Sequence, residues 1–383
     1  MLKGDFPLKS FEGVRTPFYC YDLQLLGRTL DRLQSILTAN PDYRLHYAVK
    51  ANFNPRILSI IASRGFGADC VSGGEINAAL AAGFSPDGIV FAGVGKSDEE
   101  ILLGLRKGIS RFNVESEAEL RVISELAVSL GTKARVSLRV NPDIGAHTHA
   151  NITTGLAENK FGISYEQLEN VLQLALNLEG IEFKGLHFHI GSQILDMADF
   201  VALCNRINRL RSDLEAKGLP TGDINVGGGL GIDYMHPNHK DIADFEGWFG
   251  TFSKFLDRRP GVQLHFEPGR SIVGPCGTLI SRVLYVKEGT GKRFAIIDGS
   301  MTELVRPAMY KAYHRVENLS SEGPETVYDV VGPVCESSDV FAVATTLNEC
   351  HRGDLIAIRS AGAYGESMAS GYNCHPLPES LFI

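Results

Sequence analysis

The sequence predicts an α/β protein in which a TIM-like (β/α)8 barrel is followed by a mostly β C-terminal domain. Eight short apolar segments recur up to residue 270, and amphipathic helical patterns lie between them. Eight such repeats in about 250 residues are typical of this barrel. Beyond residue 270, short alternating segments follow one another without long helices, as expected of a β domain.

The eight predicted barrel strands share their length, their β-branched residues and the Gly, Asp or Asn that bounds them. They end at Val49, Val71, Gly93, Val114, Val140, Ile190, Gly227 and Glu267. A doubly wound parallel sheet of similar length is the alternative fold.

Helix starts are predicted between these strands by capping boxes, in which a Ser precedes a Glu or Gln by three residues. The pattern occurs at residues 97–100, 116–119 and 164–167, each time ahead of apolar residues at helical spacing. Helices are therefore expected to begin at all three places.

The expected domain boundaries follow from the change of pattern near residue 269. Residues 26–268 are predicted to form the barrel and residues 269–383 the β domain. The segment TPFYCYD also has the pattern of a strand, so residues 1–25 are expected to add a strand to the β domain.

Composition argues against several classes of partner. Lysine and arginine number 37 and aspartate and glutamate 45, so the net charge is −8 and no broad field favours nucleic acid or an anionic membrane. The seven cysteines include no C-x-x-C pair, which is typical of reduced thiols in a cytoplasmic protein. No signal peptide or membrane-spanning run is apparent.

Reactive side chains are expected where the barrel strands end, because barrel active sites lie at the carboxyl ends of the strands. Lys50 is predicted as the last residue of the first strand, where burial would favour its amine as a nucleophile towards an aldehyde. Glu267 ends the eighth strand and is followed by a Pro-Gly turn and Arg270.

Two further strand ends complete the expected site. His187 and His189 are predicted to share one face of the sixth strand, where an imidazole can stack on an aromatic ring. The seventh strand runs into Gly227–Gly229, a turn whose backbone N–H groups can bind phosphate. The NAD fingerprint fits this turn poorly, because no acidic strand end follows at the expected spacing.

One ligand satisfies all four strand ends. Pyridoxal phosphate offers an aldehyde to Lys50, a ring to His189, a phosphate to the glycines and a pyridine nitrogen to Glu267. Metal binding by His187 and His189, or by His147 and His149, is the alternative, but no carboxylate stands at ligand spacing near either pair. No metal is therefore predicted.

The chain also resembles a known family over nearly its whole length. Nine stretches carry the resemblance, in the family's order: HYAVKANFNP, GADCVSGGE, HTHANITTGLAENKFGI, LHFHIGSQI, NVGGGLGIDY, EPGR, RPAMYKAYH, GPVCESSDVF and GAYGESMASGYN. On these residues the chain resembles the fold type III pyridoxal-phosphate-dependent decarboxylases, which have the alanine racemase fold, and within them the diaminopimelate decarboxylases.

The resemblance implies an activity and a set of site residues. The activity is decarboxylation of meso-2,6-diaminopimelate to L-lysine, the last step of lysine biosynthesis, in a homodimer whose active sites are shared between subunits. Lys50 would bond covalently to the cofactor, His189 would stack on its ring, and Cys335 would protonate the carbanion. The other implied cofactor contacts are Ser192, Gly227, Gly228, Gly229, Glu267, Gly269, Arg270 and Tyr364, and the implied substrate contacts are Arg270, Arg306, Tyr310, Glu336 and Tyr364.

The substrate suits these residues. Its non-reacting end carries a carboxylate, which Arg306 and Arg270 can bind, and an ammonium, which Glu336 can bind. Ornithine lacks this carboxylate, and leaving a buried arginine unpaired costs on the order of 2–5 kcal/mol.

Three other functions are the alternatives. A carboxynorspermidine decarboxylase has the same fold but acts on a substrate with one carboxylate. An amino-acid racemase would have Arg in place of Glu267, and a non-catalytic pyridoxal-phosphate-binding regulator would lack Lys50 or Cys335.

The sequence departs from the family's usual residues in two places. Gly-Ser and Thr-Glu stand within residues 299–303 where Ala-Gly and Asn-Asp are commoner, and Glu366 replaces an aromatic residue. Glu366 closely follows Tyr364, so any effect of this departure on the enzyme is expected at the rim of the substrate site.

Overall fold

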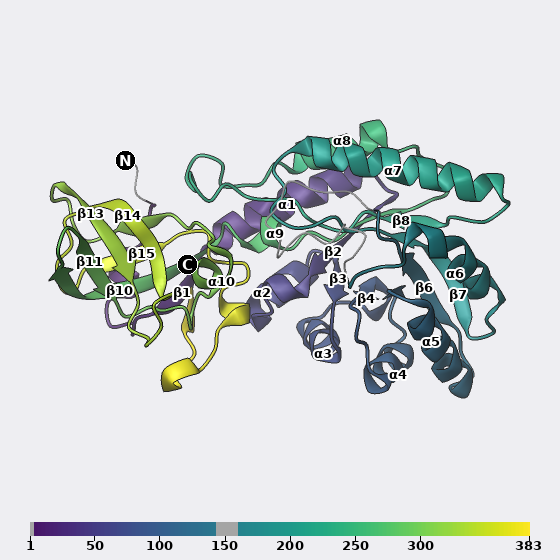
Figure 1. Ribbon diagram of the computed structural model, residues 1–383, viewed down its shortest axis with the longest axis horizontal. Helices are drawn as coiled ribbons and strands as arrows, with labels where there is room; N and C mark the ends of the chain where they lie inside the picture. Colours follow the sequence, from purple (N-terminus) through teal and green to yellow (C-terminus); the bar gives the residue numbers. More distant parts are fainter. Residues whose placement is uncertain (1–3, 143–159) are drawn as a thin grey trace. The chain divides into compact units, whose positions relative to one another are not determined.

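The computed structural model describes residues 4–142 and 160–383, and these form two compact units (Figure 1). One unit comprises residues 30–231 and 244–269, and the other residues 4–29, 232–243 and 270–383. The predicted barrel boundary encloses residues 232–243, which here belong to the second unit. Within the described ranges no helix is both long and apolar enough to span a bilayer.

The first unit is a closed barrel of eight parallel strands, in agreement with the prediction. Its strands are β2 (Tyr43–Ala48), β3 (Gly67–Cys70), β4 (Ile89–Phe91), β5 (Arg111–Val114), β6 (Ala134–Arg139), β7 (Ile181–His187), β8 (Asp223–Asn225) and β9 (Leu264–Phe266). They pair in sequence order, and β9 pairs with β2 to close the ring. This closure excludes the doubly wound alternative.

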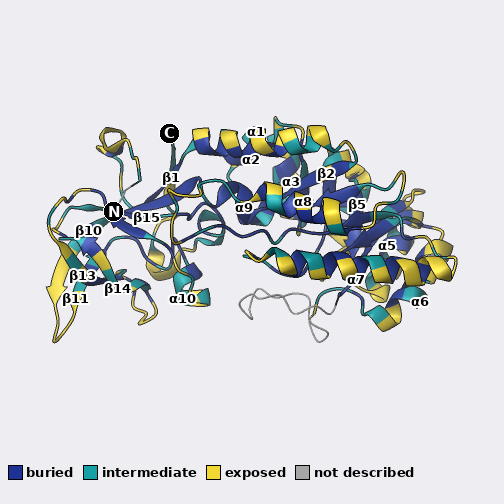
Figure 2. Ribbon diagram, turned by 90° about the horizontal axis from the view of Figure 1, so that it is seen from above, coloured by how far each residue is buried: buried dark blue, intermediate teal, exposed yellow. Residues whose placement is uncertain are grey.

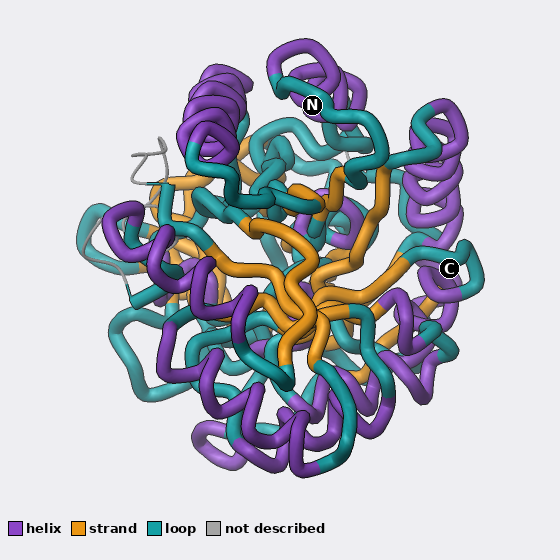
Figure 3. Tube along the Cα trace, turned by 90° about the vertical axis from the view of Figure 1, so that its right-hand side faces the viewer, coloured by secondary structure: helices purple, strands orange, loops and turns teal. Residues whose placement is uncertain are grey.

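Helices surround these strands (Figure 3). They are α1 (Leu23–Ala39, of which residues from 30 onwards belong to this unit), α2 (Pro55–Ala62), α3 (Gly73–Ala82), α4 (Asp98–Lys107), α5 (Glu117–Ser129), α6 (Tyr165–Asn177), α7 (Met197–Ala216) and α8 (Phe245–Phe255). Buried and exposed residues alternate along α7 in Figure 2, as expected for an amphipathic helix packed on a barrel.

Aromatic rings fill the space between α7, α8 and the barrel seam. Trp248 is fully buried and packs edge-on against Phe200 and Phe266, with ring centroids 6.0 and 5.2 Å away. Phe249 lies 4.5 Å from Phe266. Burying such rings stabilises the barrel by about 1.5–3 kcal/mol for each side chain.

The predicted capping boxes are only partly realised. Ser97 and Glu100 form the complete reciprocal pair at the start of α4. Ser116 accepts the hydrogen bond from Glu119 N, but the Glu119 carboxylate accepts from the backbone of Glu115 instead. Ser164 precedes α6 without a capping bond. The spacing therefore predicted where the helices begin, but it did not predict which capping hydrogen bonds form.

The second unit is built on an eight-stranded sheet, as predicted for a mostly β domain. Its strands are β1 (Phe18–Tyr21), β10 (Gly277–Glu288), β11 (Arg293–Ile297), β12 (Val316–Asn318), β13 (Glu325–Val331), β14 (Val340–Asn348), β15 (Leu355–Ile358) and β16 (Glu379–Phe382), and its short helices are α9 (Arg270–Val273) and α10 (Arg306–Tyr310). The sheet order is β12-β15-β10-β11-β13-β14, and β1 lies between β10 and β16. The predicted N-terminal strand is β1, whereas β12 and β16 were not predicted.

Candidate active site

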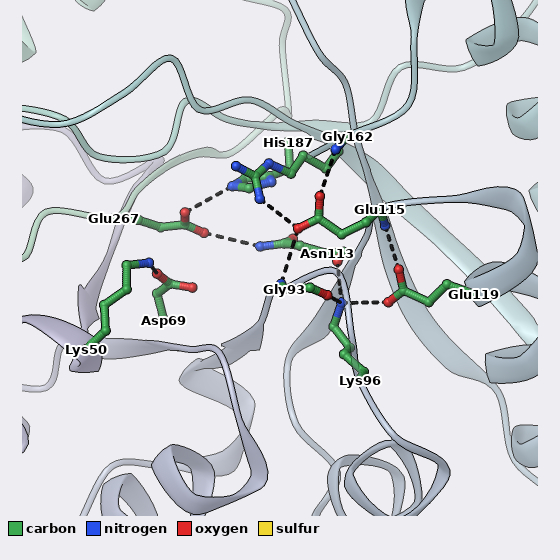
Figure 4. A network of polar contacts seen from close by, with 11 residues as sticks. Lys50, Asp69, Gly93, Lys96, Asn113, Glu115, Glu119, Gly162, His187 and Glu267 are labelled. Carbon is green, nitrogen blue, oxygen red and sulfur yellow. Dashed lines mark hydrogen bonds and ion pairs between the residues drawn. The ribbon is translucent and has the colours of Figure 1, made fainter. Parts of the chain in front are cut away.

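Lys50 lies just beyond the end of a barrel strand rather than within it. Strand β2 ends at Ala48, and Lys50 occupies the 3-10 turn Val49–Ala51, because the chain bends as soon as it leaves the pairing with β3. Its Nζ lies 3.1 Å from Oδ2 of Asp69 in β3 (Figure 4). The prediction that Lys50 is the last strand residue is therefore wrong by two positions, although its place at the barrel mouth is as expected.

Asp69 is a buried carboxyl group that was not predicted from the sequence to belong to the site. Its side chain is 2% exposed, against 40% for Lys50. Burial and the negative charge of Glu267 raise the pKa of Asp69 to about 6, against the opposing effect of Lys50. The amine of Lys50 therefore faces a carboxyl group that titrates close to neutral pH.

Glu267 follows β9 and is held by donors from three other strands. Its carboxylate accepts hydrogen bonds from Nδ2 of Asn113 in β5 at 3.2 Å and from Nδ2 of Asn225 in β8 at 2.6 Å. His187 in β7 places Nε2 3.0 Å from the same carboxylate (Figure 4). Polar side chains from these strands therefore meet at one buried point inside the barrel.

The charge of Glu267 is fixed by these contacts. Burial raises its pKa, but the proximity of His187, the hydrogen bond from His187 and the Lys50 ammonium together bring the pKa of Glu267 below its ordinary value. Glu267 is therefore an ionised carboxylate at neutral pH. Such a group can keep a pyridine nitrogen protonated.

His189 and the glycine turn lie side by side at the ends of β7 and β8. Because β7 ends at His187, the expected strand alternation does not extend to His189. His189 Nδ1 accepts a hydrogen bond from Gly228 N at 3.3 Å, and burial lowers the pKa of its ring, so the ring is neutral. A neutral ring in this place can stack on an aromatic cofactor.

The turn at Gly227–Gly229 requires glycine. Gly227 and Gly229 have φ of 72° and 108°, which is the left-handed region, and a Cβ on Gly228 would lie 2.2 Å from the backbone oxygen of Glu267. Gly227 N donates to Asn225 Oδ1 at 2.9 Å, so two of the three N–H groups already have acceptors in the protein. Phosphate binding by this turn remains a prediction.

Gly269 and Ser192 lie in two other loops of the same unit. A Cβ on Gly269 would lie 2.9 Å from Cβ of Ala48, so glycine allows the turn after Glu267 to pass close to the end of β2. The backbone N–H of Ala48 donates to Pro268 O at 3.1 Å and fixes this approach. Ser192 lies in the loop between β7 and α7.

A second network of buried charges supports the strand that carries Asn113 (Figure 4). Nζ of Lys96 donates to the backbone oxygens of Gly93 and Asn113, both at 2.8 Å, and to Glu119 at 2.6 Å. The side chain of Lys96 is 1% exposed, so all three of its donors are used inside the protein.

The same network continues to β6 through a buried ion pair. Arg139 Nη1 donates to Glu115 at 2.6 Å, and the other carboxylate oxygen of Glu115 accepts from Gly162 N at 2.9 Å. A buried pair of this kind fixes geometry more reliably than it adds stability.

In the second unit, two buried arginines lie against aromatic rings. Arg270 Nη1 donates to the hydroxyl of Tyr234 at 2.7 Å, and its guanidinium lies 4.8 Å from the ring centroid of Tyr364. Arg306 begins α10 and Tyr310 ends it. The Arg306 guanidinium lies 4.8 Å from the centroid of the Tyr234 ring.

Cys335 and Glu336 are exposed on this chain, in the loop between β13 and β14. Cys335 N donates to Oδ1 of Asn373 at 3.2 Å, and Tyr372 donates its hydroxyl to Glu336 at 2.5 Å. The segment 372–374 therefore holds this loop, and the thiol and the carboxylate are both presented on the surface of the second unit.

Comparison with known proteins gives the family. Residues 26–274 match the model of the pyridoxal-dependent decarboxylases, described as their pyridoxal binding domain. A diaminopimelate decarboxylase of Bacteroides thetaiotaomicron is 60% identical over 378 residues, which cover 99% of this chain and 98% of that protein. The crystal structure of the Helicobacter pylori diaminopimelate decarboxylase with L-lysine superposes with a TM-score of 0.90 at 40% identity, covering 98% and 93% of the two chains.

The chain belongs to the diaminopimelate decarboxylase family. The crystal structure of the M. jannaschii diaminopimelate decarboxylase in complex with L-lysine has a TM-score of 0.90 at 34% identity, covering 100% of this chain and 90% of that one. The cofactor of the family is pyridoxal phosphate, so the prediction of this cofactor is confirmed. The residues present fit it: Lys50 offers an amine, Glu267 an ionised carboxylate, and the glycine turn a backbone that a Cβ would obstruct.

The two departures from the family's usual residues have structural explanations. Glu303 is buried and its carboxylate accepts from the backbone and hydroxyl of Ser300 and the hydroxyl of Thr302, so it caps the turn that it ends. Glu366 accepts a hydrogen bond from the hydroxyl of Tyr21 in β1 at 2.5 Å. Both carboxylates therefore form hydrogen bonds within the second unit.

Several residues that support the candidate site were not predicted from the sequence. Asp69 had a detectable signal, because it is a carboxylate inside the apolar strand segment GADCV. Asn113, Asn225 and Lys96 had no such signal, because the carboxylates that they bind, Glu267 and Glu119, come from other elements of the fold. His147 and His149, weighed as metal ligands, lie outside the described residues, and the described residues contain no group of three metal-ligating side chains.

Proposed function

We propose that this chain removes carbon dioxide from meso-2,6-diaminopimelate and releases L-lysine, the last step of lysine biosynthesis. The structural observation that carries the choice of substrate is Arg306. Its side chain is buried, its exposed fraction is 5%, and among the described residues no carboxylate pairs with it. A buried guanidinium without a counter-ion favours a ligand that brings a carboxylate.

The proposed cofactor-binding residues lie largely in the barrel unit. Bound pyridoxal phosphate supplies the electron sink that stabilises the carbanion left by carbon dioxide. Lys50 holds the cofactor covalently until substrate arrives, Glu267 keeps the pyridine nitrogen protonated, and His189 covers the ring. Ser192, Gly227, Gly228, Gly229, Gly269, Arg270 and Tyr364 complete the proposed cofactor contacts.

The proposed substrate residues come from the second unit. Arg306 and Arg270 bind the carboxylate of the non-reacting end, and Glu336 binds its ammonium. Tyr310 and Tyr364 complete the substrate contacts. Cys335 Sγ donates the proton that replaces the lost carboxylate, so the substrate gives up carbon dioxide and gains one proton.

We further propose that the chain acts as a homodimer in the cytoplasm. The exposure of Cys335 and Glu336 on a single chain supports this proposal, because a proton donor and a substrate contact are expected to be enclosed when they act. Reduced thiols fit the cytoplasm, and all seven cysteines are free.

An assay on purified holoenzyme tests the activity. Meso-diaminopimelate, ornithine and carboxynorspermidine are supplied separately, and carbon dioxide and the amine products are measured. We expect release of L-lysine from meso-diaminopimelate and little turnover of the other two, because neither offers the second carboxylate. Preferential formation of norspermidine would contradict the proposal, and so would absence of turnover in the presence of added pyridoxal phosphate.

A further inference from the structure

Two buried cations contact one tyrosine, Tyr234, in the second unit. The exposed fractions of Arg270 and Arg306 are 6% and 5%. Arg270 donates to the hydroxyl of Tyr234 at 2.7 Å, while the Arg306 guanidinium lies 4.8 Å from the centroid of the same ring. The tyrosine thus stabilises one cation with its oxygen and the other with its π face.

His314 fixes the second of these arginines. Its Nε2 lies 2.7 Å from Nη1 of Arg306, and its Nδ1 lies 2.9 Å from the backbone oxygen of Arg359. An arginine nitrogen can only donate and a carbonyl oxygen can only accept, so Nε2 is the acceptor and Nδ1 carries the proton. The two contacts therefore select the neutral form of His314 that carries its proton on Nδ1.

The histidine ring is also held in place by Tyr234. The two rings pack edge to face, with centroids 5.0 Å apart and planes at 78°. His314 is 1% exposed and Tyr234 is 8% exposed, so both contacts with the arginines are shielded from water. Hydrogen bonds in such surroundings are stronger than at the surface.

We propose that Tyr234 and His314 are positioning residues that hold Arg306 and Arg270 ready for the distal carboxylate of the substrate. This inference rests on the proposed function, because it takes diaminopimelate as the substrate. His314 occupies one N–H of Arg306 and Tyr234 covers one face, which leaves the other N–H groups to form a bidentate contact. Neither residue needs to touch the substrate to set its affinity.

A pair of inhibitors separates this role from a general structural one. L-lysine retains the distal carboxylate of the substrate, whereas 1,5-diaminopentane differs from L-lysine only by lacking it. The inhibition constant of 1,5-diaminopentane divided by that of L-lysine therefore reports the contact between the arginines and the carboxylate. This quotient is called the ratio below, and it falls when the contact is lost. A variant that only loosens the fold weakens both inhibitors alike and leaves this ratio unchanged.

Two amide substitutions at His314 form a matched pair. His314→Asn places an amide near Nδ1 and keeps the bond to Arg359, but it withdraws the acceptor from Arg306. His314→Gln places its amide near Nε2 and keeps that acceptor. We expect H314N to reduce the ratio by about tenfold to a hundredfold and to raise KM more than it lowers kcat, as for a lost hydrogen bond to a charged group.

A second pair tests the tyrosine. Tyr234→Phe removes the acceptor of Arg270 and keeps the ring under Arg306, so we expect a reduction of the ratio by about threefold or more. Tyr328→Phe is the control, because it removes another buried hydroxyl of the same unit, one that accepts from Cys350 N. We expect Y328F and H314Q to keep the ratio of the unmodified enzyme.

The outcomes distinguish this inference from the proposed function. If the unmodified enzyme releases no carbon dioxide from diaminopimelate, the proposed function fails. The positioning role is tested once the unmodified enzyme is active and binds L-lysine more tightly than diaminopentane. If H314N and Y234F then bind pyridoxal phosphate, have the melting temperature of the unmodified enzyme and keep the same ratio, the positioning role is wrong. Should H314N fail to fold, an unchanged ratio in Y234F alone contradicts it.

Discussion

At the scale of single residues, the ionised carboxylate of Glu267 carries the proposed interaction with the pyridine nitrogen of the cofactor. Three side chains from three strands surround its carboxylate, and its pKa lies below the ordinary value. A carboxylate in that state is suited to hold a proton on a pyridine nitrogen, whereas a neutral side chain is not.

Replacing Glu267 by Gln tests this role. The amide keeps the shape but cannot hold the proton, so we expect kcat for carbon dioxide release to fall by about 10²-fold or more at saturating pyridoxal phosphate. Glu117→Gln is the control, because Glu117 is half exposed on α5 and pairs with Arg121. A variant E267Q with the kcat of the unmodified enzyme would show that the charge is not required.

The side chains that stand at strand ends were predictable from the sequence, whereas those that support them were not. Lys50 and Glu267 were predictable because each follows an apolar strand and barrel chemistry collects at such ends. Asn113 and Asn225 were not predictable, because a lone amide gives no sign of a partner in another strand. Tyr234 and His314 were visible only once the contacts of the arginines were known.

At the scale of elements, the start of α4 shows what a capping box contributes. Ser97 accepts from Glu100 N and Glu100 accepts from Ser97 N, whereas Ser164 before α6 makes no capping bond. We therefore expect Ser97→Ala to lower the free energy of unfolding of the barrel by about 1 kcal/mol. The matched Ser164→Ala is expected to change it by less than about 0.5 kcal/mol, and urea unfolding measures both. Equal losses would show that the spacing, not the bond, determines the effect.

The seam where β9 meets β2 contains a stacked pair of buried histidines. His46 in β2 and His265 in β9 stack with ring centroids 5.1 Å apart, and His46 Nε2 lies 2.8 Å from His265 Nδ1. Burial, followed by the proximity of His265, lowers the pKa of His46 to about 3, with Arg111 acting in the same direction and Glu267 opposing it. His46 is therefore neutral in the folded barrel.

This pKa shift predicts a loss of stability as the pH falls. The unfolded chain takes up a proton on His46 below its ordinary pKa of 6.5 while the folded barrel does not, so stability is lost from pH 6.5 down towards pH 3. At pH 5 we expect His46 to cost about 2 kcal/mol relative to pH 7.5. Urea unfolding of His46→Gln should show a shallower pH dependence, whereas the exposed His351→Gln should not differ from the unmodified protein. An unchanged pH dependence in H46Q would show that His46 does not carry this effect.

At the scale of the whole molecule, the fold class was predictable because each barrel strand is a separate apolar segment with its own boundaries. All eight appear in the closed ring, and the predicted strands of the β domain appear in its sheet. β12 and β16 were missed because Val316–Asn318 is too short and Glu379–Phe382 too mixed to stand out. Their pairing with distant strands creates them, and a local pattern does not report that pairing.

The proposed dimer is a prediction about the assembled molecule. Sedimentation of the holoenzyme should give about twice the mass of the 41.7 kDa chain. If the active sites are shared, mixing Lys50→Ala and Cys335→Ala subunits should restore activity to about a quarter of the normal level by recombining one intact site per mixed dimer. A monomer that decarboxylates diaminopimelate at full rate would contradict the proposed sharing.

The attachment of pyridoxal phosphate to Lys50 is the central claim, because every proposed role depends on a cofactor held at that place in the barrel. Holoenzyme treated with borohydride and then digested should yield one phosphopyridoxyl-modified peptide, and fragmentation by mass spectrometry should place the modification on Lys50. Modification of a different lysine, or a protein that takes up no pyridoxal phosphate, would contradict the account.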